Sequence, residues 1–299
     1  MPSLAAALAA APVVLDGGLS TELEARGHDV SSALWSARLL RDDPRAIADA
    51  HAAFAAAGAQ VATTASYQAT VEGFGAVGVG AGDAHRLIAS SVALAREGQG
   101  DAGWVAGSVG PYGAMRADGS EYTGAYVDDV DVAQLRAFHR PRMEILAEAG
   151  ADVLSCETVP AAAEAEALIA EAAALGVPIW LSLTTVVDAD GVVRTRRGDV
   201  ASDVFAMTKG VDAVIAVGVN CTDPAGVGAA IEAAAGAAKP VVVYPNSGEG
   251  WDAVDRRWTG SPGISPDDVP GWVAAGARLV GGCCRVRPQH IRDIAVLLS

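Results

Sequence analysis

The chain has 299 residues, of which 51% are hydrophobic and 5% aromatic, a composition that predicts a large core of small aliphatic side chains and excludes intrinsic disorder. Its 21 Lys and Arg against 36 Asp and Glu leave a net charge of −15, which repels nucleic-acid phosphates and anionic lipids. We therefore expect no nucleic-acid partner and no membrane partner, and polar residues interrupt the uncharged stretch 50–71 too often for a membrane span.

The amino-terminal segment and the cysteine content indicate the compartment. The first 15 residues are mostly apolar, but no Lys or Arg precedes Arg26, so they do not predict a secretory signal peptide. Four cysteines are too few for a disulfide framework in a chain of this length. We expect a cytoplasmic protein whose cysteines serve metal or thiol chemistry.

Short apolar runs rich in β-forming residues alternate along the chain with Ala-rich segments of helical pattern. The expected strands are 13–18, 60–68, 104–110, 152–158, 179–185, 213–221, 240–247 and 278–284. The expected helices lie near 43–57, 83–98, 131–149, 161–175, 200–209, 223–238, 267–275 and 288–298. Asp43 before Pro44, Asp129, and Arg287 before Pro288 are the expected starts of three of them.

Eight such repeats predict an α/β fold, a single-domain (β/α)8 TIM barrel over residues 1–299, because helices must cover a parallel sheet and closure removes its edges. An open, doubly wound sheet is the alternative. Active sites of such barrels lie at the carboxyl ends of the strands. The polar residues expected there are Asp16, Ser66, Tyr67, Gln68, Ser108, Cys156, Glu157, Thr184, Thr185, Asn220, Cys221, Asn246, Ser247, Cys283 and Cys284.

Three cysteines stand out in this set. Cys221 ends the sixth expected strand, and Cys283 and Cys284 end the eighth, so only one strand separates them in a barrel. Thiolates select zinc, and three protein ligands leave the fourth tetrahedral position to a substrate. Adjacent strand residues point to opposite faces, but Gly281 and Gly282 allow the backbone to leave strand geometry. The pattern indicates a catalytic zinc site.

Other interpretations of these cysteines remain open from the residues alone. They are a disulfide between Cys283 and Cys284, a single catalytic thiol with a histidine base, and a structural zinc, which ordinarily has four protein ligands. Cys156 is expected as a buried free thiol, and its neighbour Glu157 is the better functional candidate.

Two further patterns do not predict function. The GFGAVG segment at 73–78 fits a dinucleotide-binding motif, but no strand runs directly into it. Lys209 and Lys239 precede expected strands, which places them away from the active-site end and argues against Schiff-base chemistry.

Several longer segments resemble the homocysteine S-methyltransferase family over nearly the whole chain, most closely the type that uses S-methylmethionine. They are DGGLSTELEARG (16–27), ASYQAT (65–70), GSVGPYGAMRADGSEYTG (107–124), FHRPR (138–142), CETVP (156–160), GVNC (218–221), VVYPNSGE (242–249) and ARLVGGCCR (277–285). GVNC together with GGCCR is the specific part. The resemblance implies one homocysteine-binding barrel domain over residues 1–299.

The resemblance also implies roles for single residues. It assigns Zn²⁺ to Cys221, Cys283 and Cys284, which agrees with the pattern of the cysteines themselves. It further implies that Asp16 and Glu157 bind the amino group of homocysteine and that Asn220 orients the amino acid or the metal ligands. Substrate contacts are expected from Asn246, Ser247 and Glu249.

The implied activity is transfer of a methyl group from a sulfonium donor to the homocysteine thiolate, a reaction of methionine biosynthesis that yields methionine. S-methylmethionine is the expected donor and S-adenosylmethionine the second choice. Tyr67, Tyr112 and Trp251 are either cation–π walls for the donor or ordinary loop aromatics. A non-catalytic, redox-responsive zinc- or thiol-binding protein is the alternative function.

Overall fold

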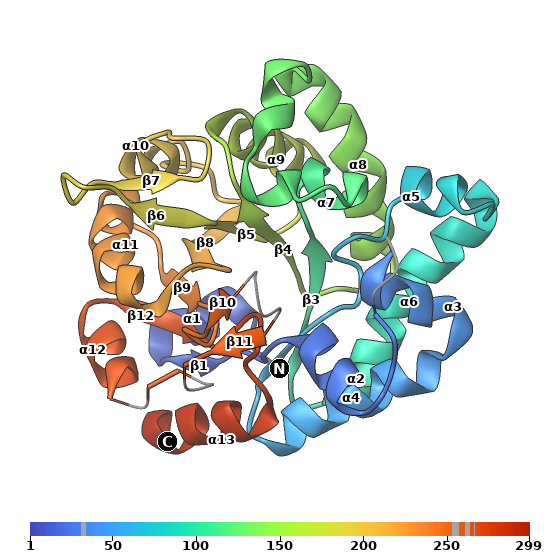
Figure 1. Cartoon of the computed structure of the whole chain (residues 1–299), viewed down its shortest axis with the longest axis horizontal. Helices are drawn as coiled ribbons and strands as arrows, with labels where there is room; N and C mark the ends of the chain where they lie inside the picture. The colour runs from blue at the N-terminus through green and yellow to red at the C-terminus, as the bar shows by residue number, and fades with distance from the viewer. Residues whose placement is uncertain (31–33, 253–256, 261–263, 266) are drawn as a thin grey trace.

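The computed structural model describes residues 1–30, 34–252, 257–260, 264–265 and 267–299. Eight parallel strands surround one axis, with helices outside them (Figure 1). Their order is β1-β12-β9-β8-β5-β4-β3-β2, and a parallel bridge between Leu15 and Val61 joins the two end strands. The sheet therefore closes on itself. The predicted (β/α)8 barrel is confirmed, and the open-sheet alternative is wrong.

All eight expected strands and all eight expected helices are present. The barrel strands are β1 (Val13–Val14), β2 (Val61–Thr63), β3 (Trp104–Val109), β4 (Val153–Val159), β5 (Ile179–Leu183), β8 (Val214–Asn220), β9 (Val241–Tyr244) and β12 (Ala277–Val280). The expected helices are α4 (Pro44–Ala56), α6 (Ala81–Gln99), α8 (Val132–Glu148), α9 (Ala162–Leu175), α10 (Ala201–Ala206), α11 (Val227–Ala234), α12 (Asp268–Ala274) and α13 (Pro288–Leu298).

The helix starts follow local capping chemistry. Asp43 caps α4 and accepts from the backbone N–H of Ala46, as expected. Asp129 was expected to begin the next helix, and this is wrong by two residues. Asp131 is the cap of α8 and forms a reciprocal capping box with Gln134. Arg287 precedes Pro288 of α13, as expected.

The barrel has two apolar layers. Side chains on the inner face, among them Trp104, Trp180 and Leu279, form one buried cluster. Side chains on the outer face form a larger cluster with the surrounding helices. This double burial explains why the strands are continuous apolar runs rather than alternating ones.

The apolar amino terminus forms a helix that the sequence did not predict, α1 (Leu4–Ala10). The Ser3 side chain accepts from the backbone N–H of Ala6, which caps the helix. Leu4 and Leu8 join the inner cluster, and the indole N–H of Trp104, the first residue of β3, donates to the Pro2 carbonyl at 3.0 Å. The helix therefore covers the amino-terminal end of the barrel.

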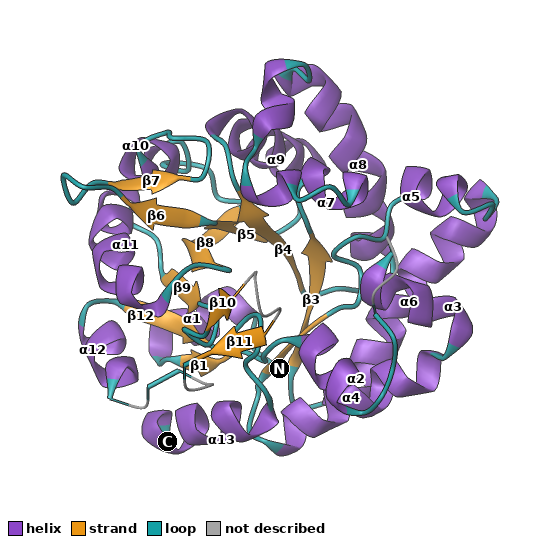
Figure 2. Cartoon of the chain, in the orientation of Figure 1, coloured by secondary structure: helices purple, strands orange, loops and turns teal. Residues whose placement is uncertain are grey.

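Short elements in the loops surround the opposite end (Figure 2). They are α2 (Leu19–Ala25), α3 (Leu39–Asp42), α5 (Val71–Ala76), α7 (Tyr112–Arg116) and the hairpins β6 (Thr185–Val187) with β7 (Val193–Thr195) and β10 (Gly250–Asp252) with β11 (Arg257–Thr259). The GFGA part of the glycine motif lies inside α5, not in a strand-to-helix loop. Among the described residues, no helix has both the length and the apolar character that a bilayer crossing requires.

The role of α1 can be tested by truncating one side chain. Leu8 is fully buried, so Leu8→Ala should lower the free energy of unfolding by about 2–5 kcal/mol through lost burial and a residual cavity. Thermal unfolding measures this as a fall of several degrees in Tm. Val296, which is 69% exposed on α13, is the control, and Val296→Ala should change Tm little. Equal effects of the two substitutions would show that α1 does not stabilise the barrel.

Candidate metal and substrate site

The carboxyl ends of four strands meet around one cavity. Six predicted site residues line it, namely Asp16, Glu157, Asn220, Cys221, Cys283 and Cys284. They lie at or near the carboxyl ends of β1, β4, β8 and β12, which are far apart in the sequence but converge at this end of the barrel. The remaining predicted residues, Asn246, Ser247 and Glu249, are not in the lining of this cavity.

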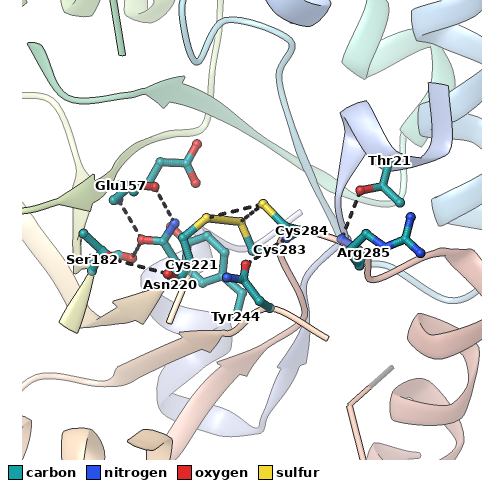
Figure 3. The surroundings of a disulfide bond; sticks show 12 residues. Thr21, Glu157, Ser182, Asn220, Cys221, Tyr244, Cys283, Cys284 and Arg285 are labelled. Atoms are coloured by element: carbon teal, nitrogen blue, oxygen red, sulfur yellow. Dashed lines mark hydrogen bonds between the residues drawn. A yellow bond between two sulfur atoms is a disulfide. The ribbon is translucent and has the colours of Figure 1, made fainter. Parts of the chain in front are cut away.

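The three cysteine sulfurs form a compact group (Figure 3). The Sγ atom of Cys284 lies 3.9 Å from that of Cys221 and 4.0 Å from that of Cys283. Cys221 and Cys283 are joined as a disulfide across a Cα–Cα distance of 5.6 Å. The expected meeting of the three side chains is therefore found. The disulfide differs from the one that the sequence left open, which paired Cys283 with Cys284.

Backbone conformation at the strand ends brings these sulfurs together. Cys221 directly follows β8 and has a φ of +47°, which is uncommon for a residue with a side chain and marks a functional or strained position. β12 ends at Val280, so Cys283 and Cys284 lie beyond the strand, as expected.

Gly281 and Gly282 serve this turn in a different way from the one predicted. Their φ values are not positive, so dihedral freedom is not what requires glycine. A Cβ at Gly281 would lie 2.5 Å from the Asp16 carbonyl oxygen, and one at Gly282 would lie 2.2 Å from the Val286 side chain. The glycines permit close packing of the cysteine segment against β1 and its own following turn.

The sulfur group fits a tetrahedral metal. Four sulfurs at about 2.3 Å from zinc are separated from one another by about 3.8 Å. The separations of 3.9 and 4.0 Å from Cys284 match this edge length. Binding by all three thiolates requires that the disulfide is reduced, since a disulfide sulfur is not a thiolate. Cys156 packs in the outer-face cluster and cannot join them, so it remains a buried free thiol.

Asp16 and Glu157 place two buried carboxyl groups in the same cavity. Asp16 accepts from the backbone N–H and the hydroxyl of Thr63 at 2.7 and 2.8 Å, and Glu157 accepts from the Ser108 hydroxyl. Burial raises the pKa of Asp16 to about 8, although the Thr63 hydrogen bonds oppose the shift. Burial also raises the pKa of Glu157. These groups need a cationic partner to ionise fully at neutral pH.

Asn220 holds the site together through its side-chain amide. Its Oδ1 accepts from the Thr158 backbone N–H and its Nδ2 donates to the Thr158 hydroxyl, both at 2.7 Å. Oδ1 also accepts from the Ser182 hydroxyl. Thr158 has a φ of +59° and follows Glu157, so this amide fixes the backbone that carries the Glu157 carboxyl.

The loop after β9 supports the cysteine segment from behind. The Cys284 backbone N–H donates to Asn246 Oδ1 at 3.2 Å, and the Ser247 N–H donates to the Cys284 carbonyl at 3.0 Å. Glu249 pairs with Arg285 at 3.1 Å and accepts from the Ser247 hydroxyl at 2.9 Å. The three residues that were expected to contact substrate thus contact the segment that carries Cys284.

The aromatic candidates have different positions. Tyr67 lines the cavity, whereas Tyr112 packs against Tyr126 and Phe138 at ring distances of 5.3 and 4.9 Å outside it. The packing of Tyr112 favours the second of the two interpretations, an ordinary loop aromatic. Trp251 belongs to β10, and its side chain is outside the part of the chain that the structure describes.

Two cavity-lining tyrosines were not recognised from the sequence. Tyr122 lines the cavity together with Cys284, and Tyr244 lies between Ser155 and the Trp180 indole inside the barrel. Tyr122 belongs to the GSEYTG segment, which the strand pattern leaves in a loop. Tyr244 ends an apolar run, where a tyrosine is expected to pack in the core rather than line a cavity.

The FHRPR segment forms a buried support below this region. Arg142 donates from Nη1 to the carbonyl oxygen of Tyr67 and from Nη2 to that of Gly110, and Nη2 also lies 3.2 Å from Nδ1 of His139. His139 Nε2 lies 2.9 Å from a carboxylate oxygen of Glu164. Arg142 occupies the apolar face of α8 one heptad after Leu135, a spacing that could have revealed a buried charge.

In the described part of its lining, the cavity has acidic groups without basic ones. Among the described residues that line it, none is Lys or Arg, while Asp16, Glu157 and three cysteines are present. An enclosed surface of this kind favours cationic ligands, and with a metal bound to three thiolates it would still carry net negative charge.

Comparison with known proteins agrees with this chemistry. Residues 13–298 match the family model described as homocysteine S-methyltransferase. A homocysteine S-methyltransferase from Escherichia coli is 44% identical, covering 95% of this chain and 94% of its own. The metallated form of homocysteine methyltransferase MmuM from Escherichia coli superposes with a TM-score of 0.83 at 42% identity, covering 95% and 96% of the two chains. Its oxidised form gives the same score and identity, covering 95% of each.

The raised pKa of Asp16 predicts pH-dependent binding of an amino acid. An ammonium group stabilises ionised Asp16, so protons compete with the ligand below pH 8 and affinity rises with pH. The dissociation constant of methionine, which has the amino group but no thiol, should fall about ten-fold between pH 6.5 and 7.5 in calorimetric titrations. Asp16→Asn should weaken binding and flatten this slope. An unchanged slope in that variant would exclude Asp16 as the coupled group.

Proposed function

Since this chain belongs to the homocysteine S-methyltransferase family, we propose that it transfers a methyl group from S-methylmethionine to homocysteine with a zinc ion held by Cys221, Cys283 and Cys284. S-adenosylmethionine is the second candidate donor. The observation that carries the proposal is the position of three sulfurs within 4.8 Å of one another, beside two buried carboxyl groups in one cavity.

The metal would activate the homocysteine thiol as the nucleophile. When bound, zinc lowers the pKa of the homocysteine thiol and holds the thiolate in a fixed direction. The reduced side chains of Cys221, Cys283 and Cys284 would supply three ligands and leave one position for the substrate sulfur. The metallated form of a close structural relative supports a metal at such a site.

The other residues would orient homocysteine. Asp16 and Glu157 would accept hydrogen bonds from its ammonium group, which satisfies the buried carboxylates and the cation together. Asn220 positions Glu157 through Thr158, and Asn246 positions Cys284 through its backbone N–H. Positioning of this kind contributes much of the rate enhancement of a bimolecular reaction.

The chemistry of a sulfonium donor suits this cavity. The thiolate forms a bond to the methyl carbon while the bond from that carbon to the donor sulfur breaks, and the electron pair stays on the donor sulfur. The leaving group is then a neutral thioether that needs no proton. Homocysteine and S-methylmethionine thus give two methionines and release the thiol proton to solvent. The anionic lining favours the cationic donor over a neutral one.

The alternative of a non-catalytic thiol-binding protein has weaker support. The Cys221–Cys283 disulfide is the observation that favours it. The ordered pair of carboxyl groups and the family assignment over residues 13–298 both favour an enzyme instead.

The proposal is tested with reduced, zinc-loaded protein. We expect about one zinc per chain by elemental analysis and formation of methionine from homocysteine with S-methylmethionine, lost on chelation and restored by zinc. Cys284→Ser should bind zinc more weakly and lose at least 100-fold in activity, because a thiolate ligand is replaced by a hydroxyl.

Cys156→Ala is the matched control, since this thiol is buried in the outer-face cluster away from the metal ligands. It should retain both zinc and turnover. Full activity of a zinc-free preparation, or equal loss in the two cysteine variants, would contradict the proposal. Comparison of S-methylmethionine, S-adenosylmethionine and betaine identifies the donor.

A further inference from the structure

We propose that Gln68 determines donor specificity: its side-chain carbonyl accepts a hydrogen bond from the α-ammonium group of an amino-acid sulfonium donor. This inference rests on the proposed function, because it places the donor in the same cavity. It goes beyond it by naming the group that would distinguish an amino-acid donor from a methyl donor without N–H groups.

The amide of Gln68 is only half satisfied. Its Nε2 donates to the Ala114 carbonyl of α7 at 3.0 Å, and Gln68 lines the cavity while being only 4% exposed. Its Oε1 is buried and has no hydrogen-bond partner in the part of the chain that the structure describes. Buried polar atoms are nearly always paired, so an unpaired acceptor in a binding cavity indicates a donor group that arrives with the ligand.

The geometry of the amide lets the ligand reach this oxygen. The terminal torsion of a glutamine side chain is broad, so a rotation small enough to keep the Nε2 bond to Ala114 can bring Oε1 within reach of a ligand in the cavity. The nitrogen cannot serve instead, because it is committed to α7. A group that meets Oε1 must therefore donate, and among the parts of S-methylmethionine only the ammonium has N–H bonds.

Gln68 belongs to the loop that follows the carboxyl end of β2. Along the loop after β2, the Ser66 hydroxyl donates to the Ser108 carbonyl in β3. Two residues farther along the chain, the Gln68 amide donates to the Ala114 carbonyl in α7. Asp16 is bound to Thr63 at the end of β2, five residues before Gln68. Gln68 thus lies in the loop beyond the strand end that holds Asp16.

The reaction itself sets the order of the two substrates. The donor sulfur must lie on the far side of the transferred methyl from the attacking thiolate, so the donor binds on the open side of homocysteine. Tyr67 and Tyr122 line the cavity with Gln68, and the sulfonium can lie against these rings. The ammonium then has Gln68 as its acceptor at the loop end.

The test combines a change in the enzyme with the same change in the substrate. Reduced, zinc-loaded wild type and Gln68→Met are assayed with S-methylmethionine and with 4-(dimethylsulfonio)butanoate, which lacks only the amino group. Wild type should prefer S-methylmethionine by roughly ten- to hundred-fold in kcat/KM, as for a hydrogen bond to a charged group. Gln68→Met should lose at least ten-fold with S-methylmethionine and less than two-fold with the analogue.

The outcomes separate this inference from the proposed function. If wild type does not use S-methylmethionine, the proposed donor is wrong. If wild type uses both donors equally well, the inference alone is overturned, whatever the variant does. Equal losses with both donors would make Gln68 a structural residue, and an increase in KM for homocysteine alone would assign its oxygen to the other substrate.

Thr70→Ala controls for simple loosening of the loop. Thr70 lies two residues from Gln68, caps α5 by accepting from the Gly73 N–H at 2.9 Å, and is not in the cavity lining. Its substitution should leave the donor preference unchanged. If Thr70→Ala abolishes the preference as Gln68→Met does, loop position rather than the Gln68 carbonyl sets it, and the inference fails.

Discussion

The convergence of three sulfurs at one end of a closed barrel is the constraint on which the site depends. Cys221 comes from the end of β8 and the other two cysteines from beyond β12, and one strand lies between. The hydrogen-bonded parallel pairing of β12 with β9 and of β9 with β8 holds both strand ends in a fixed relation. The left-handed conformation of Cys221 and the close-packed glycines before Cys283 then turn the sulfurs toward one point.

Buried negative charge is the second organising feature, and it follows from the first. A tri-thiolate site beside Asp16 and Glu157 is unfavourable unless cations arrive, and both proposed substrates bring them. The protein compensates by fixing each anionic group with neutral donors, such as Thr63 on Asp16 and Ser108 on Glu157. Ligand charge therefore completes the site, which links affinity to pH and favours a sulfonium donor.

The sequence was sufficient for the parts of the structure that repeat or are chemically distinctive. The barrel followed from eight strand–helix repeats, and the sulfur group from GVNC and GGCCR. The sequence was insufficient where contacts between distant segments determine the structure. The Ala-rich, apolar first residues form α1 because Leu4 and Leu8 are buried against the amino-terminal end of the barrel. The residues of PNSGE contact the cysteine segment rather than the cavity, and Tyr122 joins the cavity lining from a segment without a regular sequence pattern.

X-ray absorption at the zinc edge tests the central claim most directly, because it counts the sulfurs around the ion. In reduced, zinc-loaded protein we expect three sulfurs at about 2.3 Å and one lighter atom, replaced by a fourth sulfur when homocysteine is added. Cys284→Ser should show one sulfur fewer in both states. Four protein sulfurs before the substrate is added, or a sulfur count that homocysteine does not change, would contradict the account.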